Sequence, residues 1–395
     1  MKRFIVSLVV VVGALLAACT EEQQSLPTAG LSGTFDLVLV AGKQLSDSER
    51  EPELLFVTSA DRDELRVLEL TDDATRRGYI RAPNPLSPLS VPVLPRPQAL
   101  TRDMRYDLGG TGTEVGGSYL YARSNGSASI SVVASDRAFL REVVRLNDPT
   151  APGAGRELPR QLLLSTGPVT AFAARGAEDG SSTLYYATRE VTGARLWEVR
   201  VPAPQAIIDG TGRVEGAALS VALPENIVVS SLIVLPQAGQ LAVATRAPVG
   251  TAGKSYKVDL LGNTLTELNF GGSQALQLAT HERVMGTKKD EQGQEVPDMK
   301  REAGALIFGI LDPSSCGGVR FPCPSGVLAV DTTTGATTEV AKDVTGFPML
   351  PIGSGSGVPM GLTLSTNTNL ALPGRLPLVG IVPLSSGEIL LFDAL

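Results

Sequence analysis

The feature that most constrains this fold is a pair of short, β-rich apolar runs that recurs six times. The first runs lie at residues 54–59, 119–123, 184–189, 241–246, 306–310 and 378–382, and the second at 65–70, 129–133, 196–201, 255–260, 326–331 and 388–393. Several runs alternate apolar and polar residues with a period of two, as half-buried strands do. Successive first runs start 57 to 72 residues apart, which suits four-stranded antiparallel sheets with long loops.

Further runs complete each unit. Candidate innermost strands precede the pairs at 35–40, 98–101, 169–173, 230–234, 275–279 and 360–364, and weaker outer strands follow most of them, for example at 264–268 and 337–340. Six such units predict an all-β chain folded as a β-propeller, in which radial repetition leaves only short edges exposed. Seven blades remain an alternative, because residues 35–40 could serve either end of the circle. Two packed β-sandwiches or a β-solenoid are the other architectures open to these strands.

The repeat pattern, which spans residues 34–395, resembles bacterial extracytoplasmic propellers of the tryptophan-aspartate or YVTN-like kind. No unit carries an intact signature of either kind. Two inserts interrupt the pattern. Residues 83–97 hold six prolines and predict a stiff, extended connector, and the polar, charged stretch at 287–302 predicts a projecting hairpin loop.

The N-terminus carries an export signal. Lys2 and Arg3 precede an almost wholly apolar run from Phe4 to Leu16, which has the length of a signal peptide and falls short of the roughly 20 residues that span a membrane. The run ends in Leu16-Ala17-Ala18-Cys19, which resembles the lipobox of bacterial lipoproteins. The resemblance implies cleavage before Cys19 and acylation of its thiol, so membrane lipid is the expected partner. An ordinary secretory signal or an uncleaved anchor is the alternative.

These features divide the chain into a signal peptide at 1–18, a lipid-anchored linker at 19–33 and a propeller at 34–395. Thr20 after the cysteine implies, by the same resemblance, the outer rather than the inner membrane. Removal of residues 1–18 leaves 377 residues with 32 basic and 41 acidic side chains, a net charge of −9. This balance argues against a sequence-independent nucleic-acid binder.

Two cysteines remain after lipidation, Cys316 and Cys323. In an exported chain such a pair predicts a disulfide that closes a small loop. Two free thiols or half a zinc site are the alternatives, but zinc needs further ligands and the chain has one histidine, His281.

No catalytic motif is evident in the sequence. His281 ends a candidate inner strand and could serve as a channel-lining base, although a hydrogen-bonded loop position is its plainer interpretation. The chain has no Gly-x-Ser-x-Gly elbow and no dinucleotide fingerprint. We therefore predict no catalytic residue, metal site or cofactor. Asp61, Asp103 and Glu282 are the acids available if the alternative of an enzyme holds.

Five arginines carry a binding hypothesis. Arg123, Arg189 and Arg246 end the first strand of three units, and Arg62 and Arg320 fall in the equivalent loops of two others. If the units are blades, all five lie on the same face of the disc, where planar guanidinium groups suit a carboxylate or phosphate ligand. The alternative is that each arginine pairs with a nearby acid and contributes little.

Three functions follow from these observations. The first is a non-enzymatic, envelope-tethered binding or scaffold module that presents its loop face to a protein or polymer partner. The second is a hydrolase, lyase or lactonase-like enzyme with a metal or carboxylate site at the channel mouth. The third is an assembly subunit that resembles the propeller lipoproteins that help insert outer-membrane proteins. A fold alone does not choose among them.

Overall fold

The computed structural model describes most of the body of the chain. The described residues are 35–40, 44–46, 49–50, 53–73, 76–81, 89–105, 115–149, 158–247, 253–271, 274–282, 286–289, 292–293, 295–298, 305–311, 327–332, 334–340, 361–365, 379–383 and 389–393. Almost all of the regular structure among them is β-strand. The exceptions are a single-turn helix, α2 (Pro204–Ile208), and the 3₁₀ helix η2 (Arg137–Phe139).

The strands, in chain order, are β1 (Leu37–Val40), β2 (Gln44–Ser46), β3 (Glu49–Arg50), β4 (Glu53–Ser59), β5 (Glu64–Asp73), β6 (Arg76–Arg81), β7 (Ser90–Pro92), β8 (Pro97–Arg105), β9 (Val115–Ser124), β10 (Ile130–Ala134), β11 (Arg141–Leu146), β12 (Arg160–Leu162), β13 (Val169–Gly176), β14 (Ser182–Glu190), β15 (Gly193–Val201), β16 (Glu215–Ala218), β17 (Val228–Val234), β18 (Gln240–Arg246), β19 (Ser255–Asp259), β20 (Thr264–Leu268), β21 (Ala275–Glu282), β22 (Gly286–Lys289), β23 (Glu295–Asp298), β24 (Ala305–Leu311), β25 (Val327–Asp331), β26 (Thr337–Val340), β27 (Thr363–Ser365), β28 (Val379–Pro383) and β29 (Ile389–Asp393).

The strands form consecutive blades, which we number along the chain. Blade 1 contains β1, β4, β5, β6 and β7, blade 2 contains β8 to β12, and blade 3 contains β13 to β16. Blade 4 contains β17 to β20, blade 5 contains β21, β24, β25 and β26, and blade 6 contains β27, β28 and β29. Within each blade, consecutive strands pair antiparallel, apart from the parallel edge strand β12. Every predicted inner, first and second run overlaps one of these strands, and the outer runs 264–268 and 337–340 are β20 and β26, so the predicted repeat is confirmed.

Both faces of the central blades are buried, and this decides the architecture. In β14, Leu184 and Tyr186 join one apolar cluster, which is shared with blade 2, whereas Tyr185 and Ala187 join another, which is shared with blade 4. The strands β9 and β18 divide their alternate residues between two clusters in the same way. Blades 2, 3 and 4 are therefore each packed between two neighbours, as in a β-propeller. Two packed sandwiches would leave one face of each sheet in solvent.

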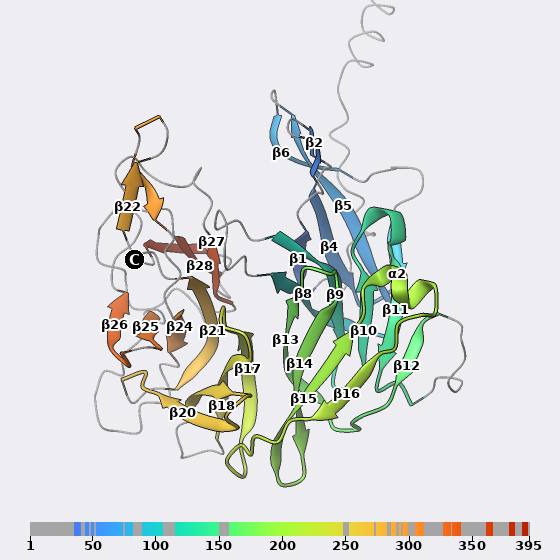
Figure 1. Ribbon diagram of the computed structural model, residues 1–395. Coiled ribbons are helices and arrows are strands. Elements are labelled where there is room, and N and C mark those ends of the chain that lie inside the picture. Colours follow the sequence, from blue (N-terminus) through green and yellow to red (C-terminus); the bar gives the residue numbers. More distant parts are fainter. Residues whose placement is uncertain are drawn as a thin grey trace, which may run out of the picture.

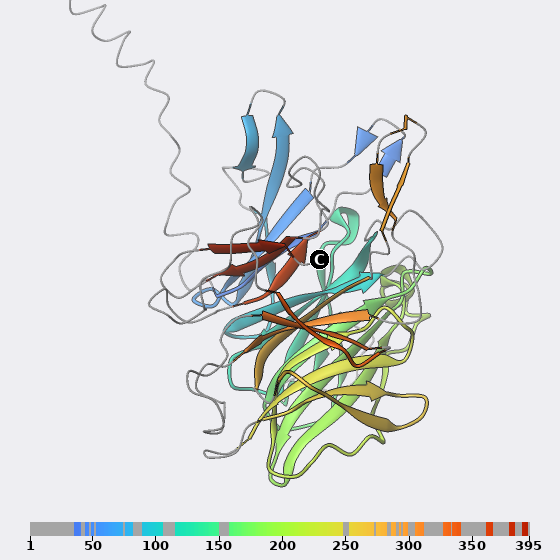
Figure 2. The same ribbon diagram turned by 90° about the vertical axis from the view of Figure 1, so that its left-hand side faces the viewer.

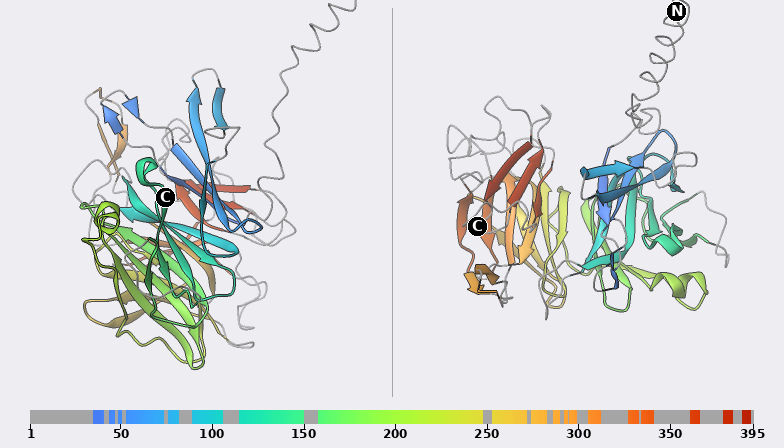
Figure 3. Two further views of the ribbon diagram at one scale, coloured as in Figure 1. Left: turned by 90° about the vertical axis from the view of Figure 1, so that its right-hand side faces the viewer. Right: turned by 90° about the horizontal axis from the view of Figure 1, so that it is seen from above.

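The blades follow one another around a common axis. Seen from above, they run from the blue strands of blade 1 to the red strands of blade 6 (Figure 3, right). The inner strands of neighbouring blades lie side by side, and between blades 2 and 3 they come close enough to pair: Ala174 of β13 pairs in parallel with Asp103 of β8. This pairing merges the two blades into one nine-stranded sheet. The number of blades in the whole chain stays a prediction.

Two small hairpins, β2–β3 and β22–β23, rise from one side of the disc (Figures 1 and 2). The second confirms the hairpin expected within residues 287–302. The turns at 60–63, 125–129 and 191–192, each of which joins the two strands of a predicted pair, lie on the opposite side, which we call the turn face (Figure 1). In the proline-rich connector, Ser90–Pro92 forms β7 at the edge of blade 1, a position where proline is tolerated.

Several predictions from the sequence lie outside the described residues. They concern the signal peptide at 1–18, the linker at 19–33 with Cys19, the pair Cys316 and Cys323, and Arg320. Among the described residues, no helix has the length and apolar character needed to cross a membrane.

Candidate functional site

The predicted arginines that the structure describes all belong to the turn face. Arg62 lies in the turn between β4 and β5, while Arg123, Arg189 and Arg246 lie at the ends of β9, β14 and β18. Arg62, Arg189 and Arg246 are exposed and belong to three different blades. They share a face as expected, but no described contact gathers them into one site. Binding of an anion by this set stays a prediction.

Arg123 differs from the other three because it is half-buried and joins two blades. Its Nη1 donates hydrogen bonds of 3.1 Å to the carbonyl oxygens of Val169 and Thr170, at the start of the inner strand of blade 3. Burial lowers the pKa of Arg123, and the charge of Asp36 acts against this shift. The guanidinium therefore caps the strand β13, a role that arginine's planar fork of donors suits.

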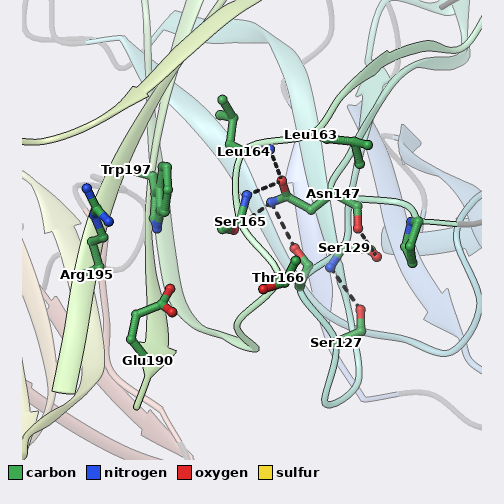
Figure 4. A pocket seen from close by; sticks show the side chains of 12 residues that line it. Ser127, Ser129, Asn147, Leu163, Leu164, Ser165, Thr166, Glu190, Arg195 and Trp197 are labelled. Atoms are coloured by element: carbon green, nitrogen blue, oxygen red, sulfur yellow. Dashed lines mark hydrogen bonds between the residues drawn. The ribbon is translucent and has the colours of Figure 1, made fainter. Parts of the chain in front are cut away.

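One pocket on the turn face lies between blades 2 and 3. It has a volume of about 620 Å³ and is lined by residues from both blades and from the segment 163–166, which leads into β13. This size falls within the range of pockets that bind small molecules. Figure 4 shows Trp197 and Glu190 on one side of the pocket, and Asn147, Ser165 and Ser129 on the other.

Asn147 holds the wall that blade 2 contributes. Its Oδ1 accepts hydrogen bonds from the backbone N–H groups of Leu164 and Ser165, at 2.7 and 2.9 Å. Its Nδ2 lies 3.1–3.2 Å from three acceptors: the carbonyl oxygen of Ala128, Oγ of Ser165 and the hydroxyl of Tyr186. Asn147 also adopts a φ of 54°, which asparagine tolerates better than most residues. The hydrogen-bonding capacity of this amide is fully used, so Asn147 shapes the pocket without facing a ligand.

The wall from blade 3 is held by a chain of hydrogen bonds. The indole Nε1 of Trp197 donates to Oγ1 of Thr188 at 2.9 Å, and that hydroxyl donates to Oε1 of Glu190 at 2.6 Å. The ring of Trp197 stacks on Tyr186, with centroids 6.1 Å apart and planes 10° from parallel. Cross-strand pairing explains the stack, because Tyr186 on β14 lies opposite Trp197 on β15. Burial raises the pKa of Tyr186, which keeps its phenol protonated.

Arg195 lies beside this indole. Its guanidinium carbon is 5.0 Å from the centroid of the Trp197 ring, a cation–π distance, and the side chain is exposed. Within the described residues, neither Arg195 nor Glu190 has an ion-pair partner. One carboxylate oxygen of Glu190 and the guanidinium donors of Arg195 are thus left to a ligand at this pocket, which Thr166 also lines. The hydroxyl of Ser127 already accepts the backbone N–H of Ser129 at 2.9 Å.

The three acids that an enzyme could use lie in different parts of the fold. Asp61 is exposed in the turn after β4, and Glu282 lies in β21 with His281. Asp103 is wholly buried, and its two carboxylate oxygens accept the N–H groups of Tyr119 and Ser118 at 2.9 and 3.1 Å. Among the described residues, no group of three His, Cys, Asp or Glu side chains could hold a metal ion.

The sequence did not reveal this pocket. In the sequence, Trp197 falls within the predicted strand 196–201 and Glu190 directly follows Arg189, and neither belongs to a motif. The useful signal was that Trp197 is the only tryptophan in the chain and lies on a strand with Arg195 two residues before it. The opposite wall comes from three separate segments, which neither spacing nor composition links.

The comparisons with known proteins report distant likeness only. No protein-family model and no curated protein matches the chain. Among solved structures, a putative 6-phosphogluconolactonase from Bacteroides fragilis is 12% identical, with a TM-score of 0.43 over 92% of this chain and 91% of that one. Hydrazine synthase from Kuenenia stuttgartiensis is 11% identical, with a TM-score of 0.44 over 84% and 70%. The Nup133 β-propeller domain of Vanderwaltozyma polyspora is 7% identical, with a TM-score of 0.40 over 91% and 82%. At such identities no activity is transferred, and the architecture rests on the sheets described above.

Proposed function

We propose that this protein is an exported lipoprotein, tethered through Cys19 to the outer membrane, whose propeller binds a ligand on its turn face. The pocket between blades 2 and 3 carries the binding half of this proposal. Its walls are fixed by hydrogen bonds, so little conformational entropy is lost when a ligand enters. Two opposite charges, Glu190 and Arg195, remain without ion-pair partners among the described residues. A rigid pocket with a few polar groups is the usual form of a ligand site.

The tether is supported by the sequence Leu16-Ala17-Ala18-Cys19 after an apolar run of signal-peptide length. It is tested by labelling cells with a radioactive fatty acid and separating their membranes. We expect the label on the full chain and its recovery with outer membranes, and we expect Cys19→Ala to abolish the label. Cys316→Ala is the matched control, because it removes a thiol outside the lipobox and should keep the label. Labelling of the Cys19→Ala variant would contradict the tether.

The binding half is tested by thermal melting of the detergent-solubilised full chain in the presence of small neutral, zwitterionic and anionic compounds. A ligand that binds only the folded state raises the melting temperature by mass action. We expect at least one class to do so saturably, and Glu190→Gln with Arg195→Gln to remove the effect. A saturable shift that survives both substitutions would place the ligand elsewhere. A hydrolase, lyase or lactonase-like activity stays a prediction from the sequence.

A further inference from the structure

We infer that the pocket between blades 2 and 3 is a site for a neutral saccharide, with Trp197 as part of its apolar wall and Glu190 and Arg195 as its hydrogen-bonding groups. This inference rests on the proposed binding function and specifies its ligand. Three properties of the pocket lead to it: its shape, its aromatic wall and the signs of its unpaired charges.

The shape favours a compact ligand. The pocket is a cavity of about 620 Å³ whose two walls belong to adjacent blades, and cavities of this size hold ligands of one or a few rings. A peptide bound as an extra strand needs a free sheet edge with backbone donors and acceptors. Here the lining groups are side chains and turn residues, and the strand that bears Trp197 is paired on both sides, with β14 and β16.

The aromatic wall is rigid and apolar. The Trp197 side chain is 9% exposed, and it lines the pocket. Its Nε1 is satisfied by Thr188 and its ring is held against Tyr186, so no polar atom of the indole remains for a ligand. Tyr186 and the guanidinium of Arg195 both lie against the ring, so the indole offers a small apolar patch beside that guanidinium, against which the C–H groups of a sugar ring can pack. Leu163, 65% exposed, adds an apolar side chain on the wall opposite Trp197 (Figure 4).

The charges favour a neutral ligand with hydroxyl groups. Glu190 supplies an acceptor and Arg195 supplies donors within one pocket, and each sugar hydroxyl can both donate and accept. An inorganic anion would gain from Arg195 but would be repelled by Glu190, and a simple cation would meet the reverse. A zwitterion such as a free amino acid could pair with both Glu190 and Arg195, so the experiment must distinguish a zwitterion from a saccharide.

The chain supplies its own probe for the test. Trp197 is the only tryptophan in the sequence, so tryptophan emission reports on this pocket alone. We would titrate the detergent-solubilised full chain with glucose, N-acetylglucosamine and maltose as neutral saccharides, with L-leucine as a zwitterion, and with inorganic phosphate as an anion. We expect at least one saccharide to change the emission saturably, and L-leucine and phosphate to leave it unchanged.

Two variants complete the test. Glu190→Gln should weaken saccharide binding at least 10-fold, because a neutral amide is a poorer acceptor than a carboxylate. Glu267→Gln is the matched control, since Glu267 pairs with Lys254 on the surface of blade 4, and it should leave the affinity unchanged. Saturation by L-leucine or phosphate but by no saccharide would overturn the saccharide inference and leave the binding function standing. If no saccharide, zwitterion or anion changes the emission, both the saccharide inference and the proposed binding function are contradicted. Saccharide binding that is equal in Glu190→Gln and the native chain would overturn the site.

Discussion

Asp103 is the buried carboxyl group that most couples this fold to pH. It is wholly buried between β8, β9 and β13, and a Cβ added at Gly117 would lie 1.9 Å from its Oδ1, so only glycine allows this approach. Burial raises the pKa of Asp103 to about 6, against the opposing effect of the N–H groups of Tyr119 and Ser118. The folded chain therefore holds this proton more tightly than the unfolded chain, whose Asp pKa is about 3.9.

The sign of the resulting pH effect follows by linkage. Below about pH 4 both states are protonated, whereas between about pH 4 and 6 the unfolded state ionises first, so the free energy of unfolding falls as pH rises. We expect a loss of about 3 kcal/mol across this window from Asp103. Asp103→Asn should flatten the dependence by that amount in urea melts at pH 4 and pH 6.5. The same slope in both proteins would mean that Asp103 ionises freely in the folded state.

Asn147 is the residue on which the pocket wall most depends. Asn147→Ala removes the hydrogen bonds to Leu164, Ser165 and Tyr186 and leaves their polar atoms without partners, and we expect a loss of about 3 kcal/mol in the free energy of unfolding. Asn226→Ala is the matched control, since Asn226 also has a positive φ, 59°, but an exposed side chain. Its loss should be about 1 kcal/mol. Urea melts that give equal losses would show that φ alone matters at Asn147.

At the scale of elements, arginines join the blades through backbone carbonyl oxygens. Arg102 donates to Leu39 of blade 1, and Arg175 donates to three consecutive carbonyls, of Leu235, Pro236 and Gln237, in the turn after β17, at 2.9–3.1 Å. Arg123 acts in the same way on blade 3. The sequence places arginines at the ends of blade strands, but it does not show that one of them, Arg123, bonds to the backbone of the next blade.

We expect Arg175→Lys to destabilise the protein by about 1–3 kcal/mol, because an ammonium group keeps the charge but cannot reproduce the planar set of donors. Arg200→Lys is the control, since Arg200 is exposed and forms an ion pair with Glu198 on its own strand. Its effect should lie within about 0.5 kcal/mol of zero. The two losses would be compared by thermal melting, and a control loss as large as that of Arg175→Lys would refute the blade-joining role.

The central strands were predictable from the sequence because both of their faces are buried, which gives continuous apolar runs such as Leu184-Tyr-Tyr-Ala187. The pocket was not predictable, because Asn147 contacts groups at 128, 164, 165 and 186, which lie in different segments. Such contacts depend on how blades 2 and 3 are placed in space. The spacing of residues along the sequence gives no information about that placement.

At the scale of the whole molecule, the first and last blades are the ends of the arc seen in Figure 3. Val38 and Val40 of β1 pack towards blade 2, so Leu37 and Leu39 point the other way, and they are 57% and 38% exposed. Blade 6 likewise has exposed apolar side chains, Ile389 and Leu391 of β29. Apolar side chains left on both terminal blades are what a closing seam would bury.

We therefore expect blade 1 and blade 6 to pack against each other in solution, which makes Leu37 more sensitive than its exposure suggests. Leu37→Asp should lower the free energy of unfolding by about 1–3 kcal/mol, because it would place a charge in an apolar seam. Leu261→Asp is the control: Leu261 is 86% exposed in the turn after β19, and its substitution should change the stability by less than about 0.5 kcal/mol. The free energy of unfolding of both variants would be measured by chemical denaturation. Equally small losses in the two variants would mean that blades 1 and 6 do not pack against each other.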